Sequence, residues 1–119
     1  MVNREALGAA LNYAVSLKSL ERFEEAKSLL RKEIPVARRV LGEGNRLALK
    51  MRWIYAEALY KDGSATLDDL REAVTMLEET ARIARHVMGS AHPLTLDLQD
   101  CLRNARTALR ARETPSGSA

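Results

Sequence analysis

An internal repeat of about 42 residues constrains this chain more than any other feature of its sequence. At a shift of 42 positions, residues 3–17 match residues 45–59 at asparagine, leucine, tyrosine and alanine positions. At a shift of 47 positions, residues 26–42 match residues 73–89, and both segments end on glycine. The difference between the shifts predicts a five-residue insertion, which we place at residues 62–66 because glycine and serine there favour a loop. Self-similarity at such a period is typical of repeat architectures.

Capping residues and helix breakers predict that the repeats are built from five helices. Asparagine and threonine cap helix starts, proline is tolerated in a first turn, and glycine ends a helix. Within the second helix, Pro35 removes one backbone hydrogen bond, so we expect a kink or a local break there. The predicted helices run from the Asn3 cap to about Leu20, from Arg22 to Leu41, from the Asn45 cap to about Lys61, from the Thr66 cap to Met88, and from His92-Pro93 to about Arg112.

Short connections make successive helices antiparallel, so the predicted fold is all-α, a stack of helical hairpins. We assign residues 1–112 to one helical repeat domain, with repeat one at 3–42, repeat two at 45–89 and a terminal helix at 92–112. Alanines that recur in the repeats should lie where paired helices approach closely: Ala14, Ala26, Ala56 and Ala73. The proline- and serine-containing tail 113–119 is predicted to be disordered.

Composition limits the class of protein. The net charge is only +3, which is a weak signal for nucleic acid. The single cysteine excludes an internal disulfide, the start of the chain shows no apolar signal segment, and no run approaches eighteen apolar residues. We therefore expect an intracellular, cytoplasmic protein that does not span a membrane.

Four short motifs point to a family. Leu41-Gly42 is followed by a capped helix, residues 92–96 read histidine-proline-leucine-threonine-leucine, residues 11–14 read leucine-asparagine-tyrosine-alanine, and residues 22–26 hold a glutamate pair before alanine. With these motifs, the chain resembles the tetratricopeptide repeat, in the 42-residue variety found in kinesin light chains. Repeat two departs from that pattern, because Trp53-Ile54 replaces an asparagine pair.

The resemblance implies a right-handed α-solenoid of about two and a half units, whose first helices line a concave groove that binds a peptide or helix of a partner protein. A tryptophan flanked by lysines suits an extended segment with an apolar anchor and acidic residues. By register, the groove candidates are Leu11, Asn12, Val15, Lys18, Ser19, Lys50, Trp53, Glu57, Tyr60, Lys61, Asp100 and Asn104.

Each candidate also has a structural interpretation. Trp53 either lines the groove or packs between helix pairs, and Asn12 either binds a ligand backbone or is solvated. Cys101 falls on the apolar stripe of the last helix and is expected in the core. His86 and His92 lack the spacing of metal ligands, and His92 belongs to the helix start with Pro93. With no phosphate loop, acyl-transfer elbow or zinc spacing, we expect no enzyme activity, no cofactor and no small-molecule substrate.

Three functions remain open. The first is an adaptor or scaffold module that binds a protein segment in its groove. The second is a self-associating structural segment of a longer repeat array, and the third is a basic nucleic-acid-binding module. For the last helix, Arg103, Arg106 and Arg110 face away from the apolar stripe, and we interpret them as a solvating surface that closes the stack rather than as a surface for RNA or membrane.

Overall fold

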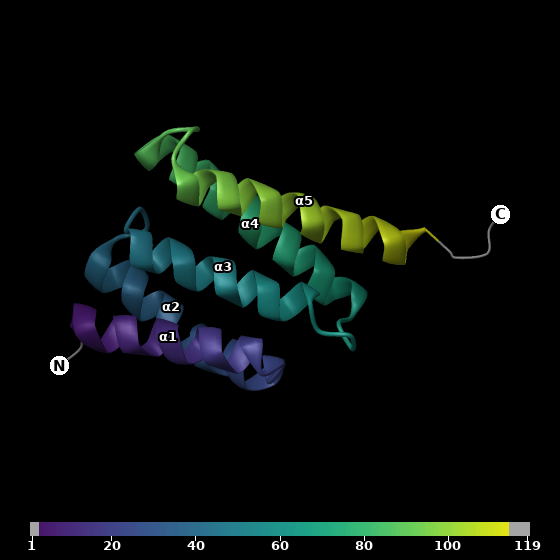
Figure 1. The fold of residues 1–119 in the computed structure, drawn as a ribbon, viewed down its shortest axis with the longest axis horizontal. Helices are drawn as coiled ribbons and strands as arrows, with labels where there is room; N and C mark the ends of the chain where they lie inside the picture. The colour runs from purple at the N-terminus through teal and green to yellow at the C-terminus, as the bar shows by residue number, and fades with distance from the viewer. Residues whose placement is uncertain (1–2, 115–119) are drawn as a thin grey trace.

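The computed structural model describes residues 3–114, and these form five α-helices joined by short connections (Figure 1). The described residues contain no β-strand, so the predicted all-α class is confirmed. Every helix end agrees with its predicted position to within one residue. The helices are α1 (Arg4–Ser19), α2 (Phe23–Leu41), α3 (Arg46–Tyr60), α4 (Leu67–Met88) and α5 (Pro93–Glu113).

Side-chain caps account for the starts of four helices. The Asn3 and Asn45 side chains accept hydrogen bonds from backbone N–H groups at 2.8 Å each, and Thr66 forms a capping box with Asp69. At α5 the Nδ1 atom of His92 accepts from the Leu94 N–H at 3.1 Å, which confirms that His92 belongs to the helix start. These acceptors satisfy N–H groups that have no partner within the helix.

The loops show where the repeats are equivalent and where they differ. The connection from α2 to α3 and the connection from α4 to α5 both open with a glycine of positive φ, Gly42 at 92° and Gly89 at 97°. By contrast, the turn from α1 to α2 occupies residues 20–22, whereas α3 and α4 are joined by residues 61–66. The insertion predicted at 62–66 therefore lies in a loop, where Asp62 accepts from the Ser64 backbone and hydroxyl.

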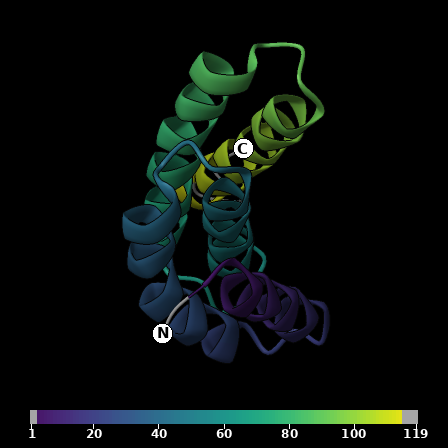
Figure 2. The same cartoon turned by 90° about the vertical axis from the view of Figure 1, so that its left-hand side faces the viewer.

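The helices pack as successive hairpins around α3. Neighbours in the chain contact each other, and α3 also contacts both α1 and α5. Figure 2 shows α2 and α4 on one side of α3, with α1 and α5 on the other. All four repeated alanines are fully buried, as predicted, because a larger side chain would hold the paired helices apart.

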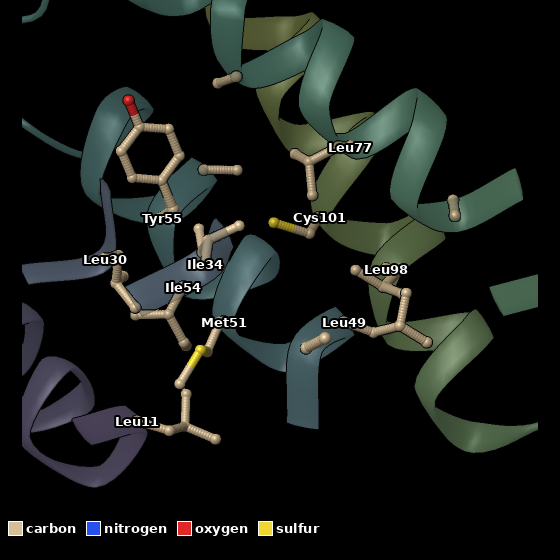
Figure 3. Close-up of a cluster of buried hydrophobic side chains, with 14 of the residues drawn as sticks. Leu11, Leu30, Ile34, Leu49, Met51, Ile54, Tyr55, Leu77, Leu98 and Cys101 are labelled. Atoms are coloured by element: carbon tan, nitrogen blue, oxygen red, sulfur yellow. The ribbon is translucent and has the colours of Figure 1, made fainter. Parts of the chain in front are cut away.

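One continuous core runs through the stack, and Figure 3 shows part of it. Leu30 and Ile34 come from α2, Leu77 from α4, and Leu98 and Cys101 from α5, and all of them pack against α3. Every helix contributes side chains to this core.

Helix α2 is continuous through Pro35, which corrects the local break expected there. It is helical from Phe23 to Leu41, and Pro35 lies on its exposed side, where a lost backbone hydrogen bond can be replaced by water. The alternative, a kink at Pro35, stays a prediction. At the other end of the chain, Glu113 is the last residue of α5, and Thr114 caps the helix through a backbone hydrogen bond to Arg110. Residues 115–119 of the tail predicted to be disordered lie outside the described residues.

Candidate partner-binding groove

One side of helix α3 carries several of the predicted groove candidates. Trp53, Glu57 and Tyr60 follow each other at four- and three-residue steps, so they share one side of the helix. This side meets α1 through Glu57 and α5 through Tyr60. We call the surface formed here by α1, α3 and α5 the groove face.

An ion-pair network lies on the groove face near the C-terminal ends of α1 and α3. Glu57 is 8% exposed and contacts two lysines, with its carboxylate 2.8 Å from the Lys18 Nζ and 3.0 Å from the Lys61 Nζ. Lys18 comes from α1, so this carboxylate joins repeat one to repeat two. Two lysines around one glutamate leave an excess positive charge at this end of the face.

Tyr60 and Cys101 link α3 to α5 on the same face. The Tyr60 hydroxyl lies 3.6 Å from the Cys101 Sγ. Burial raises the pKa of Tyr60 well above its usual value, while the Asn104 side chain opposes that shift. Burial likewise raises the pKa of the Cys101 thiol to about 11, with Tyr60 and Trp53 acting in the opposite direction. Four groove-face residues are thus gathered from two helices.

The groove face is hollowed at both ends, between α1 and α3. One hollow of about 560 Å³ is lined by Lys18, Ser19, Tyr60 and Lys61, together with Phe23. A second hollow, also of about 560 Å³, lies at the opposite ends of these helices and is lined by Leu11, Lys50, Arg4 and Arg46 among others. Six of the predicted groove candidates therefore line two depressions on one face, and lysine side chains border both.

The remaining candidates differ in their exposure. Trp53 is half-buried against the core, and its Nε1 atom is buried without a hydrogen-bond acceptor. Val15 is also half-buried, whereas Asn12 is exposed. The Asp100 carboxylate pairs with Arg103 of its own helix and faces solvent.

Comparison with known proteins identifies the family of this chain. A tetratricopeptide-repeat family model matches residues 6–46 and 65–94, which together make up more than half of the sequence. The chain belongs to the tetratricopeptide-repeat family. Neither the curated proteins nor the solved structures contain a match. Residues 47–64, which include Trp53, lie between the two segments that match this tetratricopeptide-repeat model.

Register reasoning missed some residues of the groove face. Phe23 begins α2 and Arg46 begins α3, yet both line the hollows. Register pointed only to chosen positions of the first helices, so it omitted Phe23, which belongs to a second helix, and Arg46, which is the first residue of α3. Cys101 was expected in the core and is 4% exposed, which confirms that interpretation, but it also forms part of the groove floor through Tyr60.

The chemistry of the groove face suits binding. A raised pKa keeps the Cys101 thiol protonated near neutral pH, and the thiolate is the nucleophilic form of cysteine. Among residues 3–114, no group of three or more histidine, cysteine, aspartate or glutamate side chains is arranged to hold a metal ion. No helix of the described chain is long and apolar enough to cross a membrane. Tetratricopeptide repeats are a non-catalytic class of interaction module.

The last helix of the repeat stack carries charge on its outer side. The side chains of Arg103 and Arg106 are 69% and 48% exposed, and they pair with Asp100 and with Glu78 of α4. At the shift of 47 positions, Arg103 corresponds to Ala56, one of the buried alanines where paired helices approach closely. An exposed arginine at this position solvates the face against which a following helix would have to pack.

Proposed function

We propose that this tetratricopeptide-repeat protein is a kinesin light chain-like adaptor module that binds a peptide or helical segment of another protein on its groove face and performs no catalysis. The observation that carries the proposal is the convergence of Lys18, Glu57, Lys61 and Tyr60 from two repeats at one of the two hollows of the groove face. A face assembled from separate repeats and left open to solvent suits an extended ligand that spans both.

The partner segment should carry acidic residues around an apolar anchor. Lys50 and Lys61 border the two hollows, and Lys18 is only partly neutralised because it shares Glu57 with Lys61. Trp53 lies between them on the same helix and supplies apolar surface. We further propose a cytoplasmic location, since the single thiol needs no oxidising compartment.

Substitutions on the groove face test this function. Partners are captured with the purified chain, and the binding segment of each is then measured by calorimetry. We expect Trp53→Ala and Lys61→Glu each to weaken binding about tenfold or more, as hot-spot truncations do. Lys32→Glu is the matched control, because Lys32 is exposed on α2, away from the groove face. Unchanged affinity for every partner in both groove variants would refute the proposal.

Fluorescence gives a second readout, because Trp53 is the only tryptophan. A segment that covers the groove face should reduce quenching of Trp53 by iodide. Circular dichroism of the Trp53→Ala variant checks that its helices are intact, so that lost binding is not confused with unfolding. Quenching that is the same with and without a saturating segment would place the partner elsewhere.

Self-association is a second candidate, favoured by the outer face of α1. Tyr13 occupies the register position of Tyr55, yet Tyr13 is 57% exposed and Tyr55 only 4%, because α2 covers Tyr55 whereas none of the helices described covers Tyr13. Leu20 on the same face is 67% exposed. Light scattering at increasing concentration tests this candidate: a mass that rises in the parent chain and not in Leu20→Lys supports it, and a constant monomer mass excludes it.

A further inference from the structure

A second recess lies on the opposite side of α3 from the groove face. Helices α2 and α4 both pack on α3 but make no direct backbone contact with each other in the described chain. Between them is a notch of about 330 Å³, lined by Arg38 of α2, by Arg71 and Glu79 of α4, and by Arg52 of α3. We call it the α2/α4 notch.

Arg52 is a buried charge with too few acceptors. The residue is 2% exposed. Its Nη2 atom lies 3.2 Å from the Glu79 carboxylate, its Nε donates to the weak sulfur acceptor of Met76 at 3.3 Å, and its Nη1 is buried with no partner. A guanidinium group carries five N–H donors, and leaving such donors unpaired away from water is costly. The fold therefore holds a cation that its own side chains do not satisfy.

The repeat architecture does not require an arginine at this position. In the register that relates the first helices, Arg52 corresponds to Ala10 in α1 and to Gln99 in α5. An uncharged side chain thus occupies the same place in the other two helices. Replacing a buried ion pair by uncharged residues is often neutral or stabilising, so packing alone gives no reason for Arg52.

The rim of the notch adds positive charge. The notch is lined by three arginines, Arg38, Arg52 and Arg71, and by two glutamates, Glu72 and Glu79, so its net charge is positive. Glu72 is already engaged, because it accepts a hydrogen bond from the Tyr55 hydroxyl at 2.8 Å. Arg38 also pairs with Glu43, and Arg71 contacts Asp68 at 3.4 Å, but these exposed pairs hold their arginines only weakly. We propose that the α2/α4 notch binds an oxyanion with two acceptor oxygens, a carboxylate or a phosphate, on Arg52 and the rim arginines.

Access to Arg52 needs only movement of long side chains. The Nη1 atom has no contact with solvent, so a ligand must first displace part of the rim. Arg38, Arg71 and Glu79 side chains are 44%, 53% and 43% exposed, and such side chains change rotamer readily. An incoming oxyanion would give Nη1 its missing acceptor and offer its second oxygen to the rim, the geometry that guanidinium groups favour.

The test is a titration followed by NMR at the guanidinium Nε–Hε signals, which are sharp for a buried arginine such as Arg52. Sodium acetate and inorganic phosphate are added separately, with sodium chloride at matched ionic strength as reference. We expect a saturable shift of the Arg52 signal with at least one of the two oxyanions. Saturation by acetate identifies a carboxylate site, and saturation by phosphate alone identifies a phosphate site.

Variants separate binding from folding. The double variant with Arg38→Gln and Arg71→Gln keeps Arg52 and the core intact. It should bind the oxyanion about tenfold more weakly, because two charged donors are lost. Arg39→Gln is the matched control, being exposed on the same helix but outside the notch. Shifts that do not saturate, that equal those with chloride, or that are unchanged in the double variant would overturn the proposal. This readout is independent of groove-face binding.

Discussion

The two register-equivalent tyrosines allow a stability prediction with an internal control. Tyr55 is buried between α2 and α4: its hydroxyl accepts from the Arg31 Nε at 3.2 Å and donates to Glu72 at 2.8 Å, and the Arg31 guanidinium lies 5.7 Å from the ring centre. Tyr13 has the same side chain at the equivalent position of α1 but is open to solvent. Replacing each by alanine therefore compares the same chemical change in covered and uncovered surroundings.

The expected magnitudes follow from burial. A buried aromatic ring covers about 200 Å² of apolar surface, worth about 5 kcal/mol at 25 cal/mol per Å², and measured losses for aromatic-to-alanine changes in cores are about 3–5 kcal/mol. Tyr55→Ala should lower the free energy of unfolding by about this amount. Tyr13→Ala should cost only about 2 kcal/mol, because Tyr13 is 57% exposed and so loses less than half of this burial.

Urea denaturation followed by helical circular dichroism measures the difference. With a slope of about 2 kcal/mol per molar for a chain of this size, the urea midpoint should fall by about 1.5–2.5 M in Tyr55→Ala and by about 1 M in Tyr13→Ala. Each variant is measured at two protein concentrations. Equal losses that do not depend on concentration would refute the burial argument, while a loss in Tyr13→Ala that grows with concentration would instead show that α1 is covered by another copy.

Three further changes probe the loops, the groove face and its thiol. Gly42→Ala should destabilise by about 1–2 kcal/mol in thermal unfolding, because its φ of 92° strains an alanine while no neighbouring atom is within 4 Å, whereas Gly63→Ala should stay within about 0.5 kcal/mol. Glu57→Gln should lower the free energy of unfolding in urea by about 1–2 kcal/mol, because Lys18 then loses its carboxylate partner; this figure is reduced for the partial exposure of the ion pair. An unchanged free energy would show that solvent replaces that carboxylate. The raised pKa of Cys101 favours the neutral thiol in the folded state. The free energy of unfolding should therefore be unaffected by this thiol below about pH 9 and fall as the pH rises toward 11. Cys101→Ala should flatten this pH dependence in a pH series of thermal melts.

Much of the fold could be predicted because its determinants are local. Asn3, Asn45 and Thr66 cap helices through side chains that reach only two or three residues along the chain, and Gly42 and Gly89 end helices by their own backbone freedom. The repeat also predicted which helices pair, because alanines at equivalent positions should lie where equivalent helices approach closely. Pro35 shows the limit of local reasoning: its penalty is set by whether its side of α2 is buried, and that depends on packing.

The sequence by itself determined the five helices, their order and the family. Only the tertiary structure decided which faces are covered, because coverage depends on contacts between distant residues. Tyr13 and Tyr55 hold equivalent positions in the repeat, yet Tyr13 is open to solvent and Tyr55 is buried. Likewise, nothing in the local pattern distinguishes Arg52 from the solvated arginines of neighbouring helices, and the packing of α2 and α4 on α3 is what buries it.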